Sequence, residues 1–233
     1  MKIPVTILML ITAVPLWAQS PVDAPTVATA EDFALQALVE LLLQTNTMQA
    51  EVEQLLMDQE GRELQETRAQ LLMQKPSNFR WEIIEPYSEL MVTNGSRIWR
   101  YEPDLEQVTI QAFNTELDRT PVMLLNGSAD SIRESYAVTA ATMTDGVHQR
   151  FILQPRQPDS LFERMSLTFN GVVLEEMQFE DSLGQQTSLS FHSVQRNISV
   201  DAASFSYAPL AGVDVIDSTL DSTSDSTSAA SRD

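Results

Sequence analysis

The chain has 233 residues, a formal net charge of −19 and no cysteine. Its length suits one good-sized hydrophobic core or two small ones. The lack of cysteine excludes disulfides, thiolate metal sites, cysteine nucleophiles and lipidation at a cysteine. The strong negative charge disfavours binding to nucleic acid or to anionic membrane surfaces.

The N-terminus has the pattern of a secretory signal peptide over residues 1–18. Lys2 supplies the positive charge, residues 3–16 form an apolar run, and Leu16-Trp17-Ala18 is a plausible cleavage site. A membrane span needs about 20 apolar residues, and this run is shorter. Polar residues follow it directly. Cleavage is therefore favoured over a retained anchor, and residues 19–29 become a short linker.

One helix is expected at residues 30–44. Thr29 and Asp32 fit a capping box, and Ala34, Leu38 and Leu42 lie on one helical stripe. The apolar period then changes from that of a helix to that of a strand. A helix followed by a long run of strands predicts a mainly β (α+β) protein.

Alternating side chains bounded by turn residues indicate about eleven strands. Short connections such as Asn94-Gly95 favour antiparallel hairpins. The expected strands cover residues 48–57, 62–74, 79–84, 89–93, 97–101, 105–111, 136–143, 147–154, 162–169, 172–180 and 185–200.

Residues 118–130 interrupt the strand pattern with a short apolar helical segment. Thr120 is a suitable N-cap, Pro121 suits the first helical position, and Gly127 suits the position after the end. So short a helix is marginal alone and must pack on something. A second short helical piece is expected at residues 128–135.

The C-terminus divides into a closing loop and a tail. Residues 201–215 read as a loop, whereas Asp-Ser-Thr triplets recur from Asp217, Asp221 and Asp225. A segment without an apolar face cannot join a core, so disorder is expected over residues 216–233. The folded domain is thus expected to span residues 30–215.

Residues for catalysis are scarce. The only histidines, His148 and His192, lack metal-ligand spacing, and Glu175 and Glu176 point to opposite faces of a strand. No nucleophile elbow, phosphate-binding loop or metalloprotease motif occurs. We therefore expect no catalytic residue, no metal and no cofactor, and a protein that is not an enzyme.

The segment Lys75-Pro76-Ser77-Asn78-Phe79-Arg80-Trp81 is the most informative stretch. Phe79, Trp81 and Ile83 share one face of the expected strand, because side chains alternate. Pro76 marks a strand boundary. The basic Lys75 lies beside this turn, where it can hydrogen-bond whatever covers the aromatic face.

This segment resembles the LolA family, the periplasmic carriers of outer-membrane lipoproteins. The resemblance covers residues 30–215 and agrees with the signal peptide. The absence of cysteine argues against the related lipid-anchored receptor LolB, which carries a cysteine. The matching stretches are residues 75–81, 84–86, 90–95, 98–103, 107–109, 120–125, 201–205 and 212–213.

The resemblance implies an incomplete antiparallel β-barrel of about eleven strands with an N-terminal helix and short lid helices. Lys75 takes the position of a basic residue, usually Arg, that holds the lid shut. Lysine keeps the charge but lacks the planar fork of arginine. Phe79 takes the position associated with opening and release.

The implied function is that of a periplasmic chaperone that holds acyl chains in an apolar cavity under a lid. Trp99 and Tyr101 share a face of their expected strand, but the pattern leaves open which face this is. The expected lid latch is Lys75. The expected lid residues are Pro121, Met123, Leu124 and Leu125, and the expected cavity residues are Phe79, Trp81, Ile83, Met91, Trp99 and Tyr101.

The implied partners are outer-membrane lipoproteins, the inner-membrane lipoprotein-releasing ABC transporter and the receptor LolB, with no nucleic acid. A monomer is expected. The alternative is a lipid- or lipoprotein-sensing module on the same fold, which would be expected to carry a further domain or membrane span. A third class, an enzyme using carboxylates, would need two converging acids in the cavity.

Overall fold

The computed structural model describes residues 28–113, 125, 129–143, 145–157, 160 and 162–219. They form one twelve-stranded sheet in the order β12-β6-β5-β4-β3-β2-β1-β11-β10-β9-β8-β7. The strands are β1 (Thr47–Met57), β2 (Glu63–Gln74), β3 (Asn78–Glu85), β4 (Glu89–Asn94), β5 (Arg97–Glu102), β6 (Gln107–Ala112), β7 (Tyr136–Thr142), β8 (His148–Pro155), β9 (Phe162–Asn170), β10 (Val173–Asp181), β11 (Gln186–Arg196) and β12 (Asp214–Asp217). The helical pieces are α1 (Ala30–Leu43), α2 (Ala129–Ser135), and the 3-10 turns η1 (Pro103–Leu105) and η4 (Ala202–Phe205).

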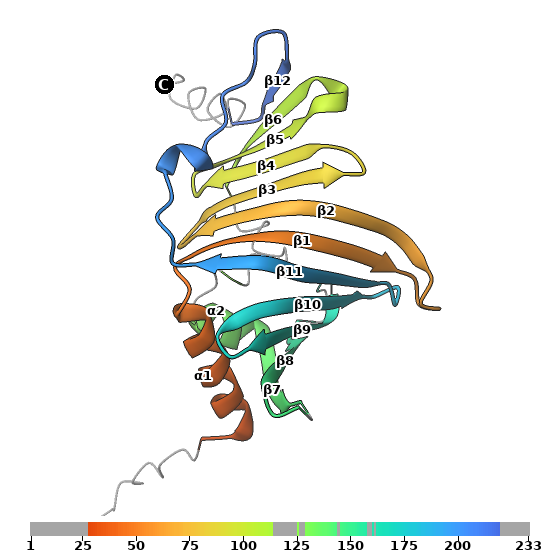
Figure 1. Cartoon of the computed structure of the whole chain (residues 1–233), viewed down its shortest axis with the longest axis vertical. Helices are drawn as coiled ribbons and strands as arrows, with labels where there is room; N and C mark the ends of the chain where they lie inside the picture. Colours follow the sequence, from red (N-terminus) through yellow and green to blue (C-terminus); the bar gives the residue numbers. More distant parts are fainter. Residues whose placement is uncertain are drawn as a thin grey trace, which may run out of the picture.

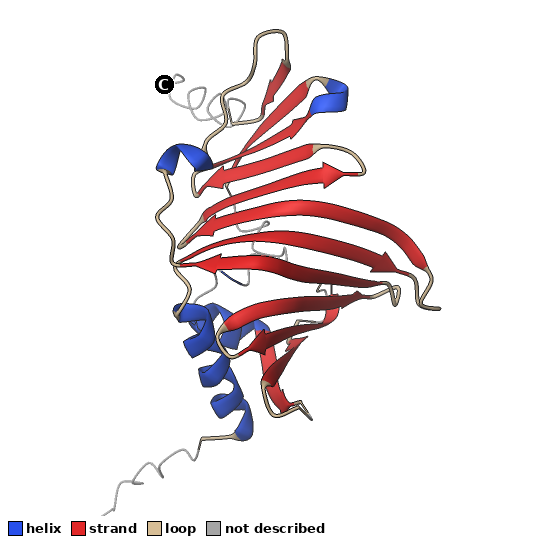
Figure 2. Cartoon of the chain, viewed as in Figure 1, coloured by secondary structure: helices blue, strands red, loops and turns tan. Residues whose placement is uncertain are grey.

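The sheet is a curved, open layer whose two edges are β7 and β12 (Figure 1). The expected mainly β fold with an N-terminal helix is confirmed, and each of the eleven expected strands is present. The few helices are small beside the sheet, and α1 and α2 lie together near β7 (Figure 2).

Strand β12 was not expected. It pairs in parallel with β6, whereas the other neighbouring strands are antiparallel. It reaches Asp217, so regular structure continues past residue 215, where a loop was expected to give way to a tail. The short sequence of β12 does not by itself indicate a strand. The segment is extended because β6 supplies partners for its backbone hydrogen bonds. Residues 1–27 and 220–233 lie outside the described residues; they hold the expected signal peptide, most of the linker and all but the first of the Asp-Ser-Thr repeats of the tail.

Helix α1 begins as expected. Thr29 and Asp32 form the capping box: the Thr29 hydroxyl accepts from the Asp32 backbone, and the Asp32 carboxylate accepts from the Thr29 backbone at 2.8 Å. The apolar stripe of Ala34, Leu38 and Leu42 is buried against the sheet. Among the described residues, no helix has the length and apolar character needed to cross a membrane.

The larger core lies on one side of the sheet, which we call the helix face. Alternation along β1, β2 and β3 places their buried side chains on this side together with those of α1. Ile132 of α2 and Leu125 join the same cluster. The sheet residues at its centre include Met48, Val52, Leu71, Met73, Phe79, Trp81, Leu153, Leu167, Phe169, Met177 and Leu189.

A second core lies on the opposite face, over β3 to β6. The side chains of this core alternate along the strands with those of the helix face. Trp99, for example, lies directly opposite Val92 and Ile110, so all three point to this second face. The chain after β11 covers this face and places Phe205 of η4 at its centre, 1% exposed. One sheet thus carries two apolar cores, one covered by helices and the other by the C-terminal segment.

Candidate functional site

The aromatic side chains of the Lys75–Trp81 segment lie on the helix face as predicted. Phe79 and Trp81 are stacked, with ring centroids 6.3 Å apart and planes 6° from parallel. Both are buried, and Ile83 and Met91 pack against the same core while remaining partly exposed. These four predicted cavity residues therefore share one apolar surface.

An apolar pocket lies between α1 and the sheet. It is small, with a volume of about 20 Å³. Leu42 comes from the end of α1, while Met48 and Met73 come from neighbouring strands, so an element that moved away from the sheet would enlarge it. Its lining consists of Leu41, Leu42, Thr45, Met48, Met73, Leu125, Phe169, Val172, Leu174 and Arg196.

Lys75 holds the end of α1 beside this pocket. Its Nζ atom donates a hydrogen bond of 2.7 Å to the Leu42 carbonyl, and its backbone N–H donates to the Asn46 carbonyl at 2.9 Å. The last carbonyls of a helix lack partners within it, so a cation there is favourable. Burial of the ammonium lowers the pKa of Lys75.

The turn before β3 depends on a neighbouring glycine. Gly95 has φ +81°, which side-chain-bearing residues rarely adopt. A Cβ atom at this position would lie 2.9 Å from the Cβ of Ser77. The Asn94-Gly95 hairpin thus packs directly against the segment that follows Lys75.

Two residues that the sequence did not single out complete the clamp on α1. Arg196 donates from Nε to the Thr45 hydroxyl at 2.7 Å and from Nη2 to the Gln44 carbonyl at 3.0 Å. Asn197 donates to the same Gln44 carbonyl at 2.8 Å and accepts from the Asn46 backbone at 2.8 Å. Their distance in sequence from the helix, about 150 residues, hid this contact.

Only one of the four expected lid residues can be placed. Leu125 is 4% exposed, belongs to the helix-face core and lines the pocket. Pro121, Met123 and Leu124 lie outside the described residues. Leu125 thus lies against the pocket, and its role as a lid residue stays a prediction.

Trp99 and Tyr101 do not lie with the other predicted cavity residues. Both belong to the second core, and Tyr101 stacks on Tyr207 with ring centroids 5.2 Å apart. The two share a face, as the sequence pattern indicated, and their strand parity places that face opposite to the one that carries Phe79 and Trp81.

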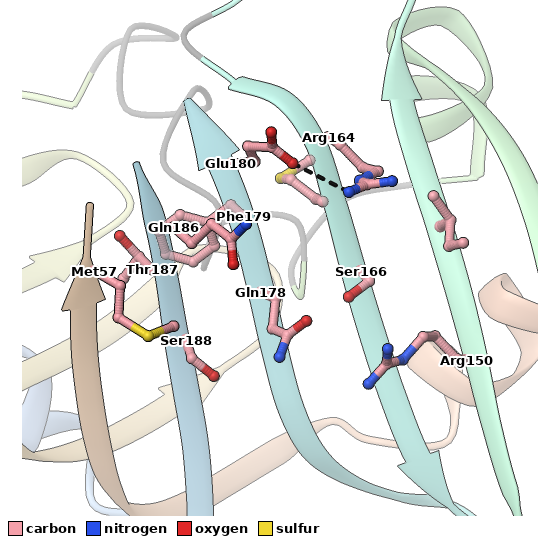
Figure 3. Close-up of a pocket in the computed structure, with 12 residues that line it drawn as sticks. Met57, Arg150, Arg164, Ser166, Gln178, Phe179, Glu180, Gln186, Thr187 and Ser188 are labelled. Carbon is pink, nitrogen blue, oxygen red and sulfur yellow. Dashed lines mark hydrogen bonds and ion pairs between the residues drawn. The ribbon is translucent and has the colours of Figure 1, made fainter. Parts of the chain in front are cut away.

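A larger groove on the opposite face has a different chemical character (Figure 3). It holds about 190 Å³ and crosses β9, β10 and β11. Ser166, Gln178 and Ser188 form its floor, and the Arg164–Glu180 ion pair, 3.1 Å long, lies at one side. Acyl chains there would dehydrate hydroxyl, amide and charged groups, so the smaller apolar pocket is the candidate site for them.

His148 links the β7–β8 hairpin to the β9–β10 hairpin. Its Nδ1 lies 2.5 Å from Asp145 Oδ2, and its Nε2 lies 3.0 Å from Glu175 Oε2. The hydrogen bond to Asp145 is the main reason that the pKa of His148 is raised, and backbone donation from His148 lowers the pKa of Asp145 to about 2. Among the described residues no group of three or more potential ligands could hold a metal ion.

The chain was compared with known proteins. The family model described as outer membrane lipoprotein carrier protein LolA matches residues 43–208. Similar curated proteins include the outer-membrane lipoprotein carrier proteins of Pseudomonas paraeruginosa, 40% identical over 82% of this chain and 91% of that protein, and of Chromohalobacter salexigens, 37% identical over 82% and 90%.

The fold also has a solved counterpart. An uncharacterised conserved protein of Thermus thermophilus shares the fold with a TM-score of 0.51 at 16% identity, covering 78% of this chain and 96% of that one. The match to the family model and the identity to curated members establish the relationship expected from the sequence. The chain belongs to the LolA family of outer-membrane lipoprotein carrier proteins.

Proposed function

We propose that the protein carries lipoproteins by holding their acyl chains on the helix face of the sheet, between α1 and strands β1, β2, β9 and β10. The observation that carries the proposal is the apolar pocket that Leu42, Leu125 and Phe169 line. Its cover consists of an amphipathic helix and a single described side chain, rather than of a paired strand.

The energy of transfer is large enough to require such a pocket. Each buried CH₂ group contributes about 0.8 kcal/mol, so an acyl chain of ordinary length gains on the order of 10 kcal/mol by leaving water. Binding by burial needs no catalytic group, which agrees with the carrier character of the family. An acidic chain also avoids adsorbing to anionic membranes on the way.

The pocket opens, in this proposal, when its cover is exchanged for cargo. Without cargo, Leu125 and the stripe of α1 fill the space, and Lys75 holds the end of α1 by one hydrogen bond. Cargo replaces the covering side chains, so the exchange is nearly balanced and the carrier can both load and unload. Lys75 is thus the latch, and Leu125 is the one expected lid residue that lies in the described part of the chain.

Transport requires partners at both membranes. We assign the protein to the periplasm, where carriers of this family act, as a monomer. It takes cargo from the inner-membrane lipoprotein-releasing ABC transporter and passes it to the outer-membrane receptor LolB.

The test is to purify the protein from the periplasm of a Gram-negative host and to identify bound lipoproteins by mass spectrometry. Leu174→Trp fills the apolar pocket, whereas Ile152→Trp adds the same bulk to the polar groove on the opposite face. We expect lipoproteins with the unmodified protein and with Ile152→Trp, and far fewer with Leu174→Trp. Absence of lipoproteins from the unmodified protein, or equal amounts with both variants, would contradict the proposal.

A further inference from the structure

The apolar pocket has one charged residue in its wall. Arg196 lies at the end of β11 and reaches the pocket beside Thr45, and the other side chains that line it are aliphatic, aromatic or thioether groups. A guanidinium is costly to place against apolar surface unless it finds acceptors. Its presence there calls for an explanation beyond packing.

The hydrogen bonds of Arg196 to Thr45 and Gln44 use only some of its N–H donors. A guanidinium has five N–H donors, whereas its bonds to Thr45 and Gln44 involve only the Nε and Nη2 atoms. No carboxylate lies within 4.0 Å of it among the described residues. By contrast, Arg150, Arg156 and Arg164 each pair with a glutamate. Within the described part of the chain, the positive charge of Arg196 at the rim of the apolar pocket therefore has no neutralising partner.

An acyl chain supplies an acceptor at the position where its hydrocarbon ends. A hydrocarbon-lined site satisfies the chain but leaves the carbonyl oxygen at its head without a donor, and a buried polar atom without a hydrogen bond costs free energy. A charged donor makes the stronger hydrogen bond to such an oxygen. Arg196 is the pocket residue whose chemistry fits this need.

We infer that Arg196 forms the head end of the acyl site, where its guanidinium donates hydrogen bonds to the ester carbonyl oxygens of the bound acyl groups. This inference rests on the proposed function, because it assumes that the apolar pocket takes acyl chains. It adds a polar subsite that selects acyl esters over plain hydrocarbon. The hydrocarbon tails then lie toward Met48, Met73 and Phe169.

A pair of isosteric ligands tests the subsite. 1,2-Dioctanoylglycerol has ester carbonyls, and 1,2-di-O-octylglycerol has ether links in their place with the same chain length. We would measure the dissociation constant of the purified protein for each by displacement of a fluorescent hydrophobic probe. The expected ester preference is about tenfold for the unmodified protein, the size of one charge-assisted hydrogen bond.

Two variants separate head recognition from helix capping. Arg196→Met should bring the two dissociation constants together by weakening ester binding, and Arg196→Lys should keep part of the preference. Arg156→Met is the matched control, because Arg156 donates to the Arg133 carbonyl near the end of α2 at 3.0 Å but lies outside the pocket. It should leave the ester preference unchanged.

The outcomes distinguish this inference from the proposed function. If both ligands bind equally well to the unmodified protein, or if Arg196→Met keeps the preference, the subsite is refuted while acyl binding stands. If neither ligand binds, the acyl pocket itself is refuted and the subsite with it. If Arg196→Met does not fold, the ester preference of the unmodified protein and its reduction in Arg196→Lys still decide.

Discussion

The two apolar cores of this sheet differ in how they are covered. The core on the opposite face is covered by the segment after β11, whose end pairs with β6 as β12; the Asp214 N–H donates to the Glu106 carbonyl at 2.8 Å. Among the described residues, the helix-face core is covered by α1, by Ile132 of α2 and by Leu125, and not by a paired strand. The two cores thus differ in the kind of cover, and the proposed function requires the helix-face core, not the other, to open.

The two covers also differ in the interactions that attach their ends to the sheet. The end of α1 is held by Lys75, Arg196 and Asn197 through side chains, which can release without breaking regular structure. The second cover is anchored by an aromatic stack and by backbone pairing. Four predictions test this contrast, from the largest expected effect to the smallest.

The closed core should respond to truncation as an ordinary core does. Phe205→Ala removes a ring that is 1% exposed and should lower the free energy of unfolding by about 3–5 kcal/mol. Denaturant titration would measure this loss. Acyl ester affinity, measured where the variant is folded, should not change, and a large loss of affinity would show that the two cores are not separate.

The core that opens should respond differently. Leu125→Ala should cost less than about 2 kcal/mol, below the usual range for a buried leucine, and should strengthen acyl ester binding about tenfold because the competing side chain is smaller. Leu153→Ala is the matched control, since Leu153 is buried in the same core but does not line the pocket. It should destabilise the protein without raising the affinity, and weaker binding by Leu125→Ala would contradict replacement of the cover by cargo.

Loss of the latch should loosen α1 without unfolding the sheet. Lys75→Met removes the hydrogen bond to the Leu42 carbonyl, with an expected cost of about 1 kcal/mol because the ammonium is only half-buried. Hydrogen exchange followed by mass spectrometry should show faster exchange in α1 and unchanged exchange in β3 to β6. Equal acceleration in both regions would indicate a general loss of stability instead.

The smallest expected effect is a dependence on pH. Hydrogen bonding to Asp145 raises the pKa of His148 in the folded protein above its ordinary 6.5, so the protonated ring stabilises the fold. This contribution is complete below the ordinary pKa and is lost as the pH rises through the raised pKa. The melting temperature of His148→Gln should therefore fall below that of the unmodified protein at low pH and converge with it at high pH. A pH-independent gap between His148→Gln and the unmodified protein would contradict the role of the protonated ring.

The sequence predicts local structure well where the signal is local. Thr29 and Asp32 mark the start of α1, and alternation in the segment from Phe79 to Ile83 indicates which side chains share a face. It cannot show which side of the sheet that face occupies. Trp99 and Tyr101 were therefore grouped correctly, but the pattern did not show that they lie opposite Phe79 and Trp81.

The parts that escaped prediction depend on contacts between distant segments. Arg196 and Asn197 meet the end of α1 only because β11 pairs with β1, and no short motif marks either residue. Strand β12 has four residues, and its aspartates resemble those of the acidic tail. The strand forms because β6 pairs with it, so its own residues did not indicate a strand.

Mapping the bound acyl chain on the protein tests the account most directly. A diacylglycerol with a photoreactive group at the chain end would be bound, irradiated and located by peptide mass spectrometry. We predict labels on helix-face residues such as Met48, Met73 and Phe169, and none around Phe205. Labels on Ser166, Gln178 and Ser188, which line the polar groove, would contradict the central claim that the helix-face core opens to receive cargo.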